Sequence, residues 1–298
     1  MPSLKKFKRT AVYNLTRLLF FFFNIIPRRT AVFIGGWLGL AAWKLFSRDR
    51  YRFLRHLNLV YKDKLSLKEK NTISCNFFIN SGKNLADVIR FKKHYRREIK
   101  PLVTVEGLEY FDRAYKEGRG LFGITGHIGN FELLAVHIAE LGYKIAVIGR
   151  EMYDSRIDQL LVANREAMGL TNIPTTGSPR KLLSWLKEGG AVGVLIDTDS
   201  FRVRGMFIPA FGRLSNTPVG QTIIGLKTGA ALLPMVCLRT ADNRYKIIIR
   251  PPIEYIPGDT SEEQVYKVTL KCTKVLEEII DRFPDQWIWL HNRWRTRP

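Results

Sequence analysis

The sequence lacks the cysteine and histidine patterns of disulfide-rich domains and zinc enzymes. Its 298 residues include three cysteines, an odd number without C-x-x-C spacing, which argues against a disulfide framework or a metal cluster. No H-x-x-x-H or H-E-x-x-H pattern occurs, so a zinc hydrolase is not indicated. We therefore predict no metal site and expect Cys75, Cys237 and Cys272 to be ordinary buried thiols in a reducing compartment.

Acidic residues are scarce relative to basic ones. The chain has 48 Lys and Arg against 27 Asp and Glu, a formal net charge of +21, which indicates an anionic partner such as nucleic acid, anionic lipid or an acidic protein. Charge alone does not choose among these. The 46% hydrophobic content excludes disorder as the main state and suffices for one large domain. A G-x-x-x-x-G-K-[ST] loop is absent, so binding of a nucleotide by that route has no support.

The sequence also has no apolar run long enough for a confident membrane span. Two runs of 16 residues, 11–26 and 31–46, follow a basic N-terminus and are separated by Pro27 and two arginines. Each would be roughly 24 Å long as a helix, short of the roughly 20 residues that cross a hydrocarbon core. We expect residues 1–46 to form an uncleaved helical membrane anchor, which either crosses once with tilt or inserts shallowly.

Residues 47–298 have the organisation of one domain, in which a helical segment precedes an α/β core. A helical segment is expected over 47–100, and from 101 to 298 strand-like and helix-like segments alternate, which predicts an α/β domain with a mostly parallel central sheet flanked by helices. Expected strands are 103–107, 120–125, 144–148, 172–174, 191–196, 231–238 and 245–250. Expected helices are 108–117, 131–141, 155–168, 179–187, 217–228 and 261–283.

The segment Thr125–Leu134, TGHIGNFELL, carries the strongest chemical signal. It places His127 and Glu132 on a turn between a buried strand and an apolar helix, so that they resemble a general base and its orienting acid. The glycines permit a tight turn, and amides at the helix start could hold a developing negative charge. This pattern favours acyl transfer. The alternative is that His127 is a helix cap or a packed side chain.

Other charged residues follow the ends of predicted strands. Arg150 comes after 144–148, and Asp197 and Asp199 come after 191–196. Ligands of open α/β sheets bind at the carboxyl ends of strands, so these residues and His127 could form one site. The alternatives are local: Arg150 could pair with a nearby carboxylate, and Asp197 could cap the next segment.

Ordered blocks of the chain resemble the bacterial lipid A biosynthesis acyltransferases, the late enzymes that add secondary acyl chains, within the lysophospholipid acyltransferase-like superfamily. The resemblance runs from about residue 18 to 298 and is densest at the C-terminal signature W-x-W-x-H-x-R-W-x-T-R-P. The other blocks are R-H-L-N-L at Arg55, G-H-I-G-N-F-E at Gly126, Gly149-Arg150, D-T-D-S at Asp197 and G-M-F-I-P-A-F-G at Gly205.

This resemblance implies a glycerolipid-acyltransferase-like fold and transfer of a fatty acyl group from acyl carrier protein, less often coenzyme A, to a hydroxyl of a membrane-bound lipid A precursor. His127 would be the base and Glu132 would hold its ring, without an acyl-enzyme and without a cofactor beyond the acyl donor. Turn amides near Gly129 and Asn130, or Arg150, would stabilise the oxyanion. The remaining expected substrate ligands are Arg150, Arg202, Arg204 and Arg213 for acceptor phosphates, with Asp197 and Asp199 organising the site.

The expected partners are acidic carrier protein, an anionic lipid acceptor and the bacterial inner membrane, with the catalytic domain facing the cytoplasm. Nucleic-acid binding is not favoured, because the predicted strands are mostly aliphatic and offer no stacking platform. The segment Ile196–Phe201, IDTDSF, departs from the P-D-x-D-Y-G common in the family. A lysophospholipid, ornithine lipid or glycolipid therefore stays open as acceptor, and a non-catalytic scaffold that binds lipid or carrier protein stays open as a different class of function.

Overall fold

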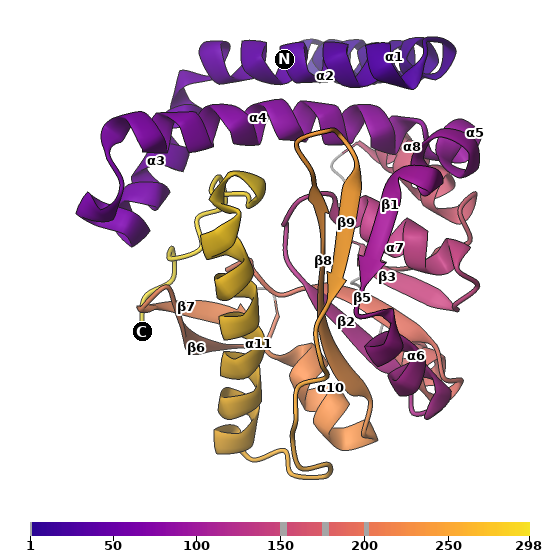
Figure 1. The fold of residues 1–298 in the computed structure, drawn as a ribbon, viewed down its shortest axis with the longest axis vertical. Helices are drawn as coiled ribbons and strands as arrows, with labels where there is room; N and C mark the ends of the chain where they lie inside the picture. The colour runs from indigo at the N-terminus through magenta and orange to yellow at the C-terminus, as the bar shows by residue number, and fades with distance from the viewer. Residues whose placement is uncertain (1, 150–153, 175–178, 200–202) are drawn as a thin grey trace.

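The computed structural model describes residues 2–149, 154–174, 179–199 and 203–298 as a helical layer above an α/β domain (Figure 1). The central sheet has the order β1-β9-β8-β2-β5-β3-β4, and all its pairings are parallel except that of β8 with β9. This confirms the predicted α/β domain with a mostly parallel sheet. Its strands are β1 Val103–Glu106, β2 Leu121–Thr125, β3 Ile145–Gly149, β4 Thr171–Pro174, β5 Ala191–Leu195, β8 Ala231–Arg239 and β9 Tyr245–Ile249.

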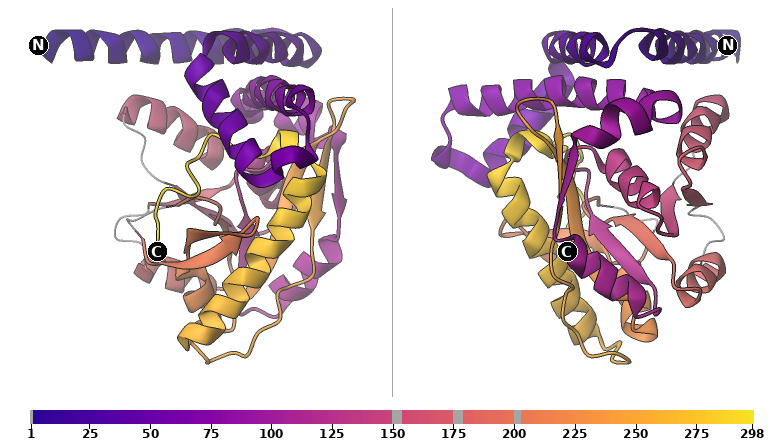
Figure 2. Two further views of the ribbon diagram at one scale, coloured as in Figure 1. Left: turned by 90° about the vertical axis from the view of Figure 1, so that its left-hand side faces the viewer. Right: turned by 45° about the vertical axis from the view of Figure 1, so that its right-hand side comes forward.

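Helices cover both faces of this sheet, and each face has its own buried apolar cluster. The long helix α11 packs on one face and α7 on the other, as the views in Figures 1 and 2 agree. The helices of this domain are α6 Leu108–Lys116, α7 Phe131–Glu140, α8 Ser155–Glu166, α9 Pro179–Lys187, α10 Gly220–Thr228 and α11 Glu262–Arg282.

The N-terminal third is helical, as expected from the sequence. Its helices are α1 Pro2–Ile25, α2 Arg28–Leu45, α3 Ser47–Tyr61, α4 Leu67–Ile89 and the short α5 Phe91–His94. Helices α1 and α2 form the outer edge of the molecule, with α4 between them and the sheet (Figure 2). The start of α4 carries a capping box, in which Ser66 and Glu69 bond each other's backbone N–H.

The expected N-terminal membrane anchor, which was to cross the bilayer once or insert shallowly, is not supported by a helix that could span. Among the described residues, no single helix is long and apolar enough to cross a membrane. One bent pair, Arg28–Leu45 with Ser47–Lys64, meets the length and composition criteria together, with an 86° bend between its parts. What the two N-terminal helices do have is a set of exposed apolar side chains, among them Phe21, Phe33 and Trp37.

One segment differs from its predicted structure. Residues 217–228 were expected to be one helix, but α10 begins at Gly220, and β7 Arg213–Pro218 pairs with β6 Gly205–Ala210 in an antiparallel hairpin. Phe211 and Gly212 at its tip both have positive φ, the conformation that a two-residue hairpin turn requires. The sequence signal is weak because the first turn residue is phenylalanine, where asparagine or aspartate is usual.

The register of β2 on β5 determines where the site forms. These strands are parallel neighbours, and Thr125 lies opposite Leu195 at their carboxyl ends. His127 and Asp197 each stand two residues beyond this last pair. The sheet therefore brings together two side chains that are 70 positions apart in the sequence.

Candidate active site

His127 and Asp197 form a hydrogen-bonded pair at the carboxyl edge of the sheet. His127 Nδ1 lies 2.9 Å from Asp197 Oδ1, and the backbone N–H of His127 donates to Asp197 Oδ2 at 2.7 Å. The Asp197 side chain is 6% exposed, whereas that of His127 is 21% exposed. The carboxylate is thus fixed inside the protein, while the imidazole remains reachable from outside.

Two glycines allow this turn to pack as it does. A Cβ at Gly126 would lie 2.9 Å from the Asp197 carboxyl carbon, so a side chain there would displace the carboxylate. Gly129 has φ +58°, and a Cβ on it would lie 2.0 Å from the carbonyl oxygen of Cys237. Both positions need glycine, one for a close approach and one for close approach and a left-handed backbone.

The pair is electrostatically coupled. Burial alone would lower the pKa of His127, but the attraction of the Asp197 charge and its hydrogen bond offset this and raise the pKa above its usual value. Burial would likewise raise the pKa of Asp197, but His127 and the donors around it hold that pKa well below its usual range. An ionised Asp197 fixes the proton on Nδ1 of neutral His127, which leaves the Nε2 lone pair available as a base.

The C-terminal segment encloses this pair from the far side. The Trp287 indole N–H donates to Asp197 Oδ2 at 2.8 Å, and the His291 ring lies 4.7 Å from the His127 ring, centroid to centroid. Asp199 accepts from the backbone N–H and the hydroxyl of Thr296, at 2.6 and 2.9 Å. The two aspartates of the D-T-D-S block therefore hold the histidine turn and the C-terminal segment in one place.

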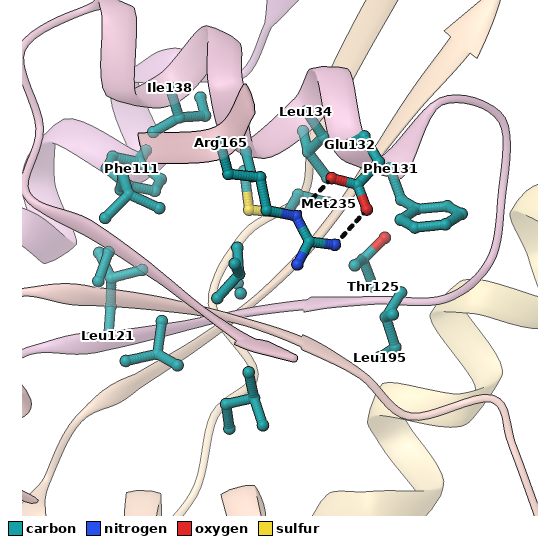
Figure 3. A pocket seen from close by; sticks show the side chains of 18 residues that line it. Phe111, Leu121, Thr125, Phe131, Glu132, Leu134, Ile138, Arg165, Leu195 and Met235 are labelled. Atoms are coloured by element: carbon teal, nitrogen blue, oxygen red, sulfur yellow. Dashed lines mark hydrogen bonds and ion pairs between the residues drawn. The ribbon is translucent and has the colours of Figure 1, made fainter. Parts of the chain in front are cut away.

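Glu132 does not hold the His127 ring, so that expectation was wrong. Its carboxylate makes a two-point ion pair with Arg165 of α8, whose Nε donates to Oε2 at 2.8 Å and whose Nη2 donates to Oε1. Glu132 lies in the first turn of α7, and its side chain points across a cavity toward α8 (Figure 3). Asp197 makes the ring contact instead.

The expected oxyanion donors are also occupied. The N–H of Gly129 donates to the carbonyl oxygen of Gln286 at 2.7 Å, and the N–H of Asn130 donates to that of Cys237 at 2.8 Å. Asn130 instead caps α7, accepting from the N–H of Leu133. The first two amides of α7, those of Phe131 and Glu132, have no acceptor among the described residues, as is normal in the first turn of a helix.

A largely apolar cavity begins beside this turn and runs under α7 along β2. Thr125, Phe131 and Leu195 line its end near the helix start, and Phe111 and Leu121 line the opposite end (Figure 3). The Glu132–Arg165 pair is the charged feature of its wall. The cavity follows the strand from Thr125 to Leu121, about 13 Å at roughly 3.3 Å per residue, and its apolar lining matches the chemistry of a hydrocarbon chain.

Comparisons with known proteins show the family of the chain. Residues 2–296 match the sequence profile of the bacterial lipid A biosynthesis acyltransferases. The chain belongs to this family. It is 25% identical to the lipid A biosynthesis palmitoleoyltransferase of Escherichia coli K12 over 92% of this chain and 87% of that protein. Identity to the lauroyltransferase of the same organism is 26%, over 89% and 85%.

Two more distant similarities are weaker. The phosphatidylinositol mannoside acyltransferase of Mycobacterium tuberculosis CDC 1551 / Oshkosh is 23% identical over 64% of this chain and 60% of that protein. The crystal structure of the 1-acyl-sn-glycerophosphate acyltransferase PlsC from Thermotoga maritima superposes with a TM-score of 0.39 and 15% identity, covering 88% of this chain and 99% of that one. The profile match over residues 2–296 and the two lipid A relatives confirm the resemblance inferred from the sequence, and the protein is an O-acyltransferase of that type.

The remaining expected ligands are the arginines assigned to acceptor phosphates. Arg150 and Arg202 lie outside the described residues. Arg204 and Arg213 are exposed at the ends of the β6–β7 hairpin. Their proposed contact with acceptor phosphates stays a prediction. No cluster of three or more His, Cys, Asp or Glu side chains suited to a metal ion occurs in the part of the chain that the structure describes.

Sequence reasoning missed two contributors to the site. Arg165 gave no signal because it lies in an ordinary amphipathic helix, and its partner is 33 positions away. Trp287 belongs to the C-terminal signature W-x-W-x-H-x-R-W-x-T-R-P, but only the fold shows that its indole binds Asp197. An isolated tryptophan near a chain end carries no such information by itself.

Proposed function

We propose that this acyltransferase moves a fatty acyl chain from an acyl carrier protein or coenzyme A thioester to a hydroxyl of a lipid A precursor at the bacterial inner membrane. The observation that carries the proposal is the His127–Asp197 pair next to Phe131, whose ring contacts the His127 ring and lines the apolar cavity. The pair supplies a base that can deprotonate an alcohol, and the cavity supplies an apolar environment for a hydrocarbon chain. The family membership supplies the acceptor class.

In this mechanism the acceptor hydroxyl gives its proton to His127 Nε2 as its oxygen attacks the thioester carbonyl carbon. The carbon–oxygen bond forms, the tetrahedral intermediate collapses with cleavage of the carbon–sulfur bond, and the proton on His127 passes to the departing thiolate. Asp197 keeps the ring oriented and stabilises the imidazolium that forms. No acyl-enzyme is needed, since the two substrates react directly.

The negative charge on the carbonyl oxygen needs donors. We propose the N–H groups of Phe131 and Glu132, because they begin α7 beside His127 and have no other acceptor among the described residues. The positive end of the α7 dipole would add to this stabilisation. The acyl chain would then extend from Phe131 along β2 into the apolar cavity.

The outer helices fit contact with a membrane surface. Phe21, Phe33 and Trp37 are each more than half exposed, at 65%, 63% and 59%, on helices that also carry many basic side chains. Aromatic side chains bind at the interface of a bilayer, and basic ones are attracted to anionic lipid and to acidic carrier protein. We propose that α1 and α2 lie on the inner membrane with the catalytic domain in the cytoplasm.

The test is acyl transfer by the purified protein in anionic vesicles with labelled acyl carrier protein. Lipid A precursor, lysophospholipid and glycolipid acceptors are supplied in parallel. His127→Ala should lower the rate by about 10²–10⁴-fold, and His94→Ala on α5 serves as the matched control. Equal activity of wild type and His127→Ala would overturn the role of His127.

A second candidate is transfer to a glycolipid other than lipid A. It is favoured by the similarity to a phosphatidylinositol mannoside acyltransferase, although that match covers a smaller part of the chain. The same acceptor panel decides between them. Labelling of the glycolipid without labelling of the lipid A precursor would select this candidate.

A further inference from the structure

A second pocket opens beside His127, and polar side chains line it together with Phe77, Phe131 and Ile288. It lies between α4 and the segment that follows α11. Phe131 lines both this pocket and the apolar cavity, so the two cavities meet at the side chain next to the helix start. The main polar residues are Asn80, Ser81 and Asn84 from α4 and Asp285 and Gln286 from the C-terminal side.

The charge of this pocket distinguishes it from the basic surface of the protein. No lysine or arginine lines it in the described part of the chain, although the protein has a net charge of +21. A neighbouring groove between α2, α4 and the β8–β9 turn is lined by four cations, Arg28, Arg29, Lys83 and Arg244, and by one carboxylate, Asp242, which pairs with Arg244. Phosphate groups would bind in that kind of groove, whereas a pocket with a carboxylate and no cation repels them.

Some of the polar groups in the pocket are already used. Asn84 donates to the carbonyl oxygen of Gly129 at 3.1 Å and accepts from Arg239 Nε at 2.9 Å. The side-chain amide of Gln286 bonds the backbone N–H and C=O of Arg239, both at 2.8 Å. These two residues therefore build the wall and hold the catalytic turn in place.

Other polar groups remain available to a ligand. Asn80 Nδ2 makes a long contact of 3.3 Å with Asp285 Oδ2. Asn80 Oδ1 and Ser81 Oγ have no hydrogen-bond partner among the described residues, and the Asp285 carboxylate contacts Asn80 Nδ2 and its own backbone N–H. The Asn80 oxygen and the ionised carboxylate are acceptors only. Such a set prefers a ligand that donates hydrogen bonds, such as a hydroxyl or an amide N–H.

We infer that this pocket binds the acceptor, and that Asp285 and Ser81 hold an uncharged, hydrogen-bond-donating part of it next to the reacting hydroxyl. The inference rests on the proposed function. With the acyl chain in the apolar cavity and the carbonyl at Phe131, the polar pocket is the side from which a hydroxyl reaches His127. Acceptor phosphates stay outside, toward the cationic surface.

The experiment measures steady-state kinetics of the full-length enzyme with separate variation of donor and acceptor. Asp285→Asn and Ser81→Ala are compared with Asp63→Asn, a matched change at an exposed position. Hydrolysis of the acyl donor by water is followed without lipid as a second readout. This hydrolysis requires His127 and the apolar cavity but no contact with the acceptor.

Each of the two variants should raise the acceptor KM about tenfold, the effect of one lost hydrogen bond. The donor KM and the rate of donor hydrolysis should match those of wild type, which also shows that the variants are folded. A selective rise in the donor KM would indicate that this pocket binds the acyl donor, and it would overturn the inference. An unchanged acceptor KM would overturn it as well. If the wild type transfers to no acceptor, the proposed function itself fails, and this result is distinct from both.

Discussion

Two carboxylates flank the turn that carries His127, and the one nearer in the sequence is not the partner of the imidazole. Glu132 is five residues from His127 yet binds Arg165, whereas Asp197 is 70 residues away and binds the imidazole. Asp197 is almost fully buried, and Glu132 lies in the wall of the apolar cavity. The difference teaches that strand register, not sequence spacing, selected the partner of His127.

Of the changes to these two carboxylates and their partners, Asp197→Asn should have the largest effect on kcat. An amide cannot hold the Nδ1 proton as a carboxylate does, so neutral His127 would populate the wrong tautomer. We expect kcat to fall about 10²–10³-fold, with the melting temperature measured alongside to exclude unfolding. Asp199→Asn is the control on the same segment. A kcat loss as large in Asp199→Asn would show that the effect is structural.

On the other side of the turn, the test is Arg165→Met. It leaves Glu132 charged and without a partner in a mostly apolar wall, which should lower the free energy of unfolding by about 3 kcal/mol. The double variant with Glu132→Leu should recover most of this loss, because no charge remains. Urea unfolding of both variants and wild type provides the measurement. A double variant no more stable than Arg165→Met would contradict this account.

A smaller effect is expected from Trp287→Phe. The ring remains while the indole donor to Asp197 is lost, and a hydrogen bond to a charged group contributes about 1.5–3 kcal/mol. Thermal unfolding should show this loss, and kcat should fall less than in Asp197→Asn. Trp43→Phe, on α2, is the control, since its indole binds Ser74 away from the site.

The smallest effect is expected in the pH dependence of stability and of kcat/KM. The pKa of His127 is raised by Asp197, so the stability that this interaction contributes is fully present below about pH 6.5 and is lost as pH rises through the raised pKa. As a base His127 must be neutral, so kcat/KM should rise over the same interval. In Asp197→Asn burial dominates, and the midpoint should move to lower pH. A midpoint unchanged by the substitution would assign the titration to another group.

Much of the fold was predictable because its signals are local. The apolar strand segments, the alternating helices and the Ser66 capping box follow directly from the sequence. The position of His127 on a strand-to-helix turn was predictable for the same reason. The β6–β7 hairpin was not, because Phe211 occupies a left-handed turn position that phenylalanine seldom adopts.

The partners at the site could not be predicted, because they depend on which strands are neighbours. Nothing in the order of segments states that β5 lies beside β2, so Asp197 could be placed at a strand end but not against His127. For the same reason, the backbone N–H groups of Gly129 and Asn130 were wrongly expected to be available to an oxyanion. Their acceptors, the carbonyl oxygens of Gln286 and Cys237, come from distant parts of the chain.

The contact of the C-terminal segment with both aspartates also has a consequence for the timing of biosynthesis. A ribosome makes the strands and the histidine turn long before it makes Trp287 and Thr296. Until those residues emerge, Asp197 lacks its indole donor and Asp199 lacks the two donors of Thr296. A nascent or C-terminally trimmed chain would therefore carry an unfinished candidate site, and any activity that depends on His127 would begin only after translation has passed this segment.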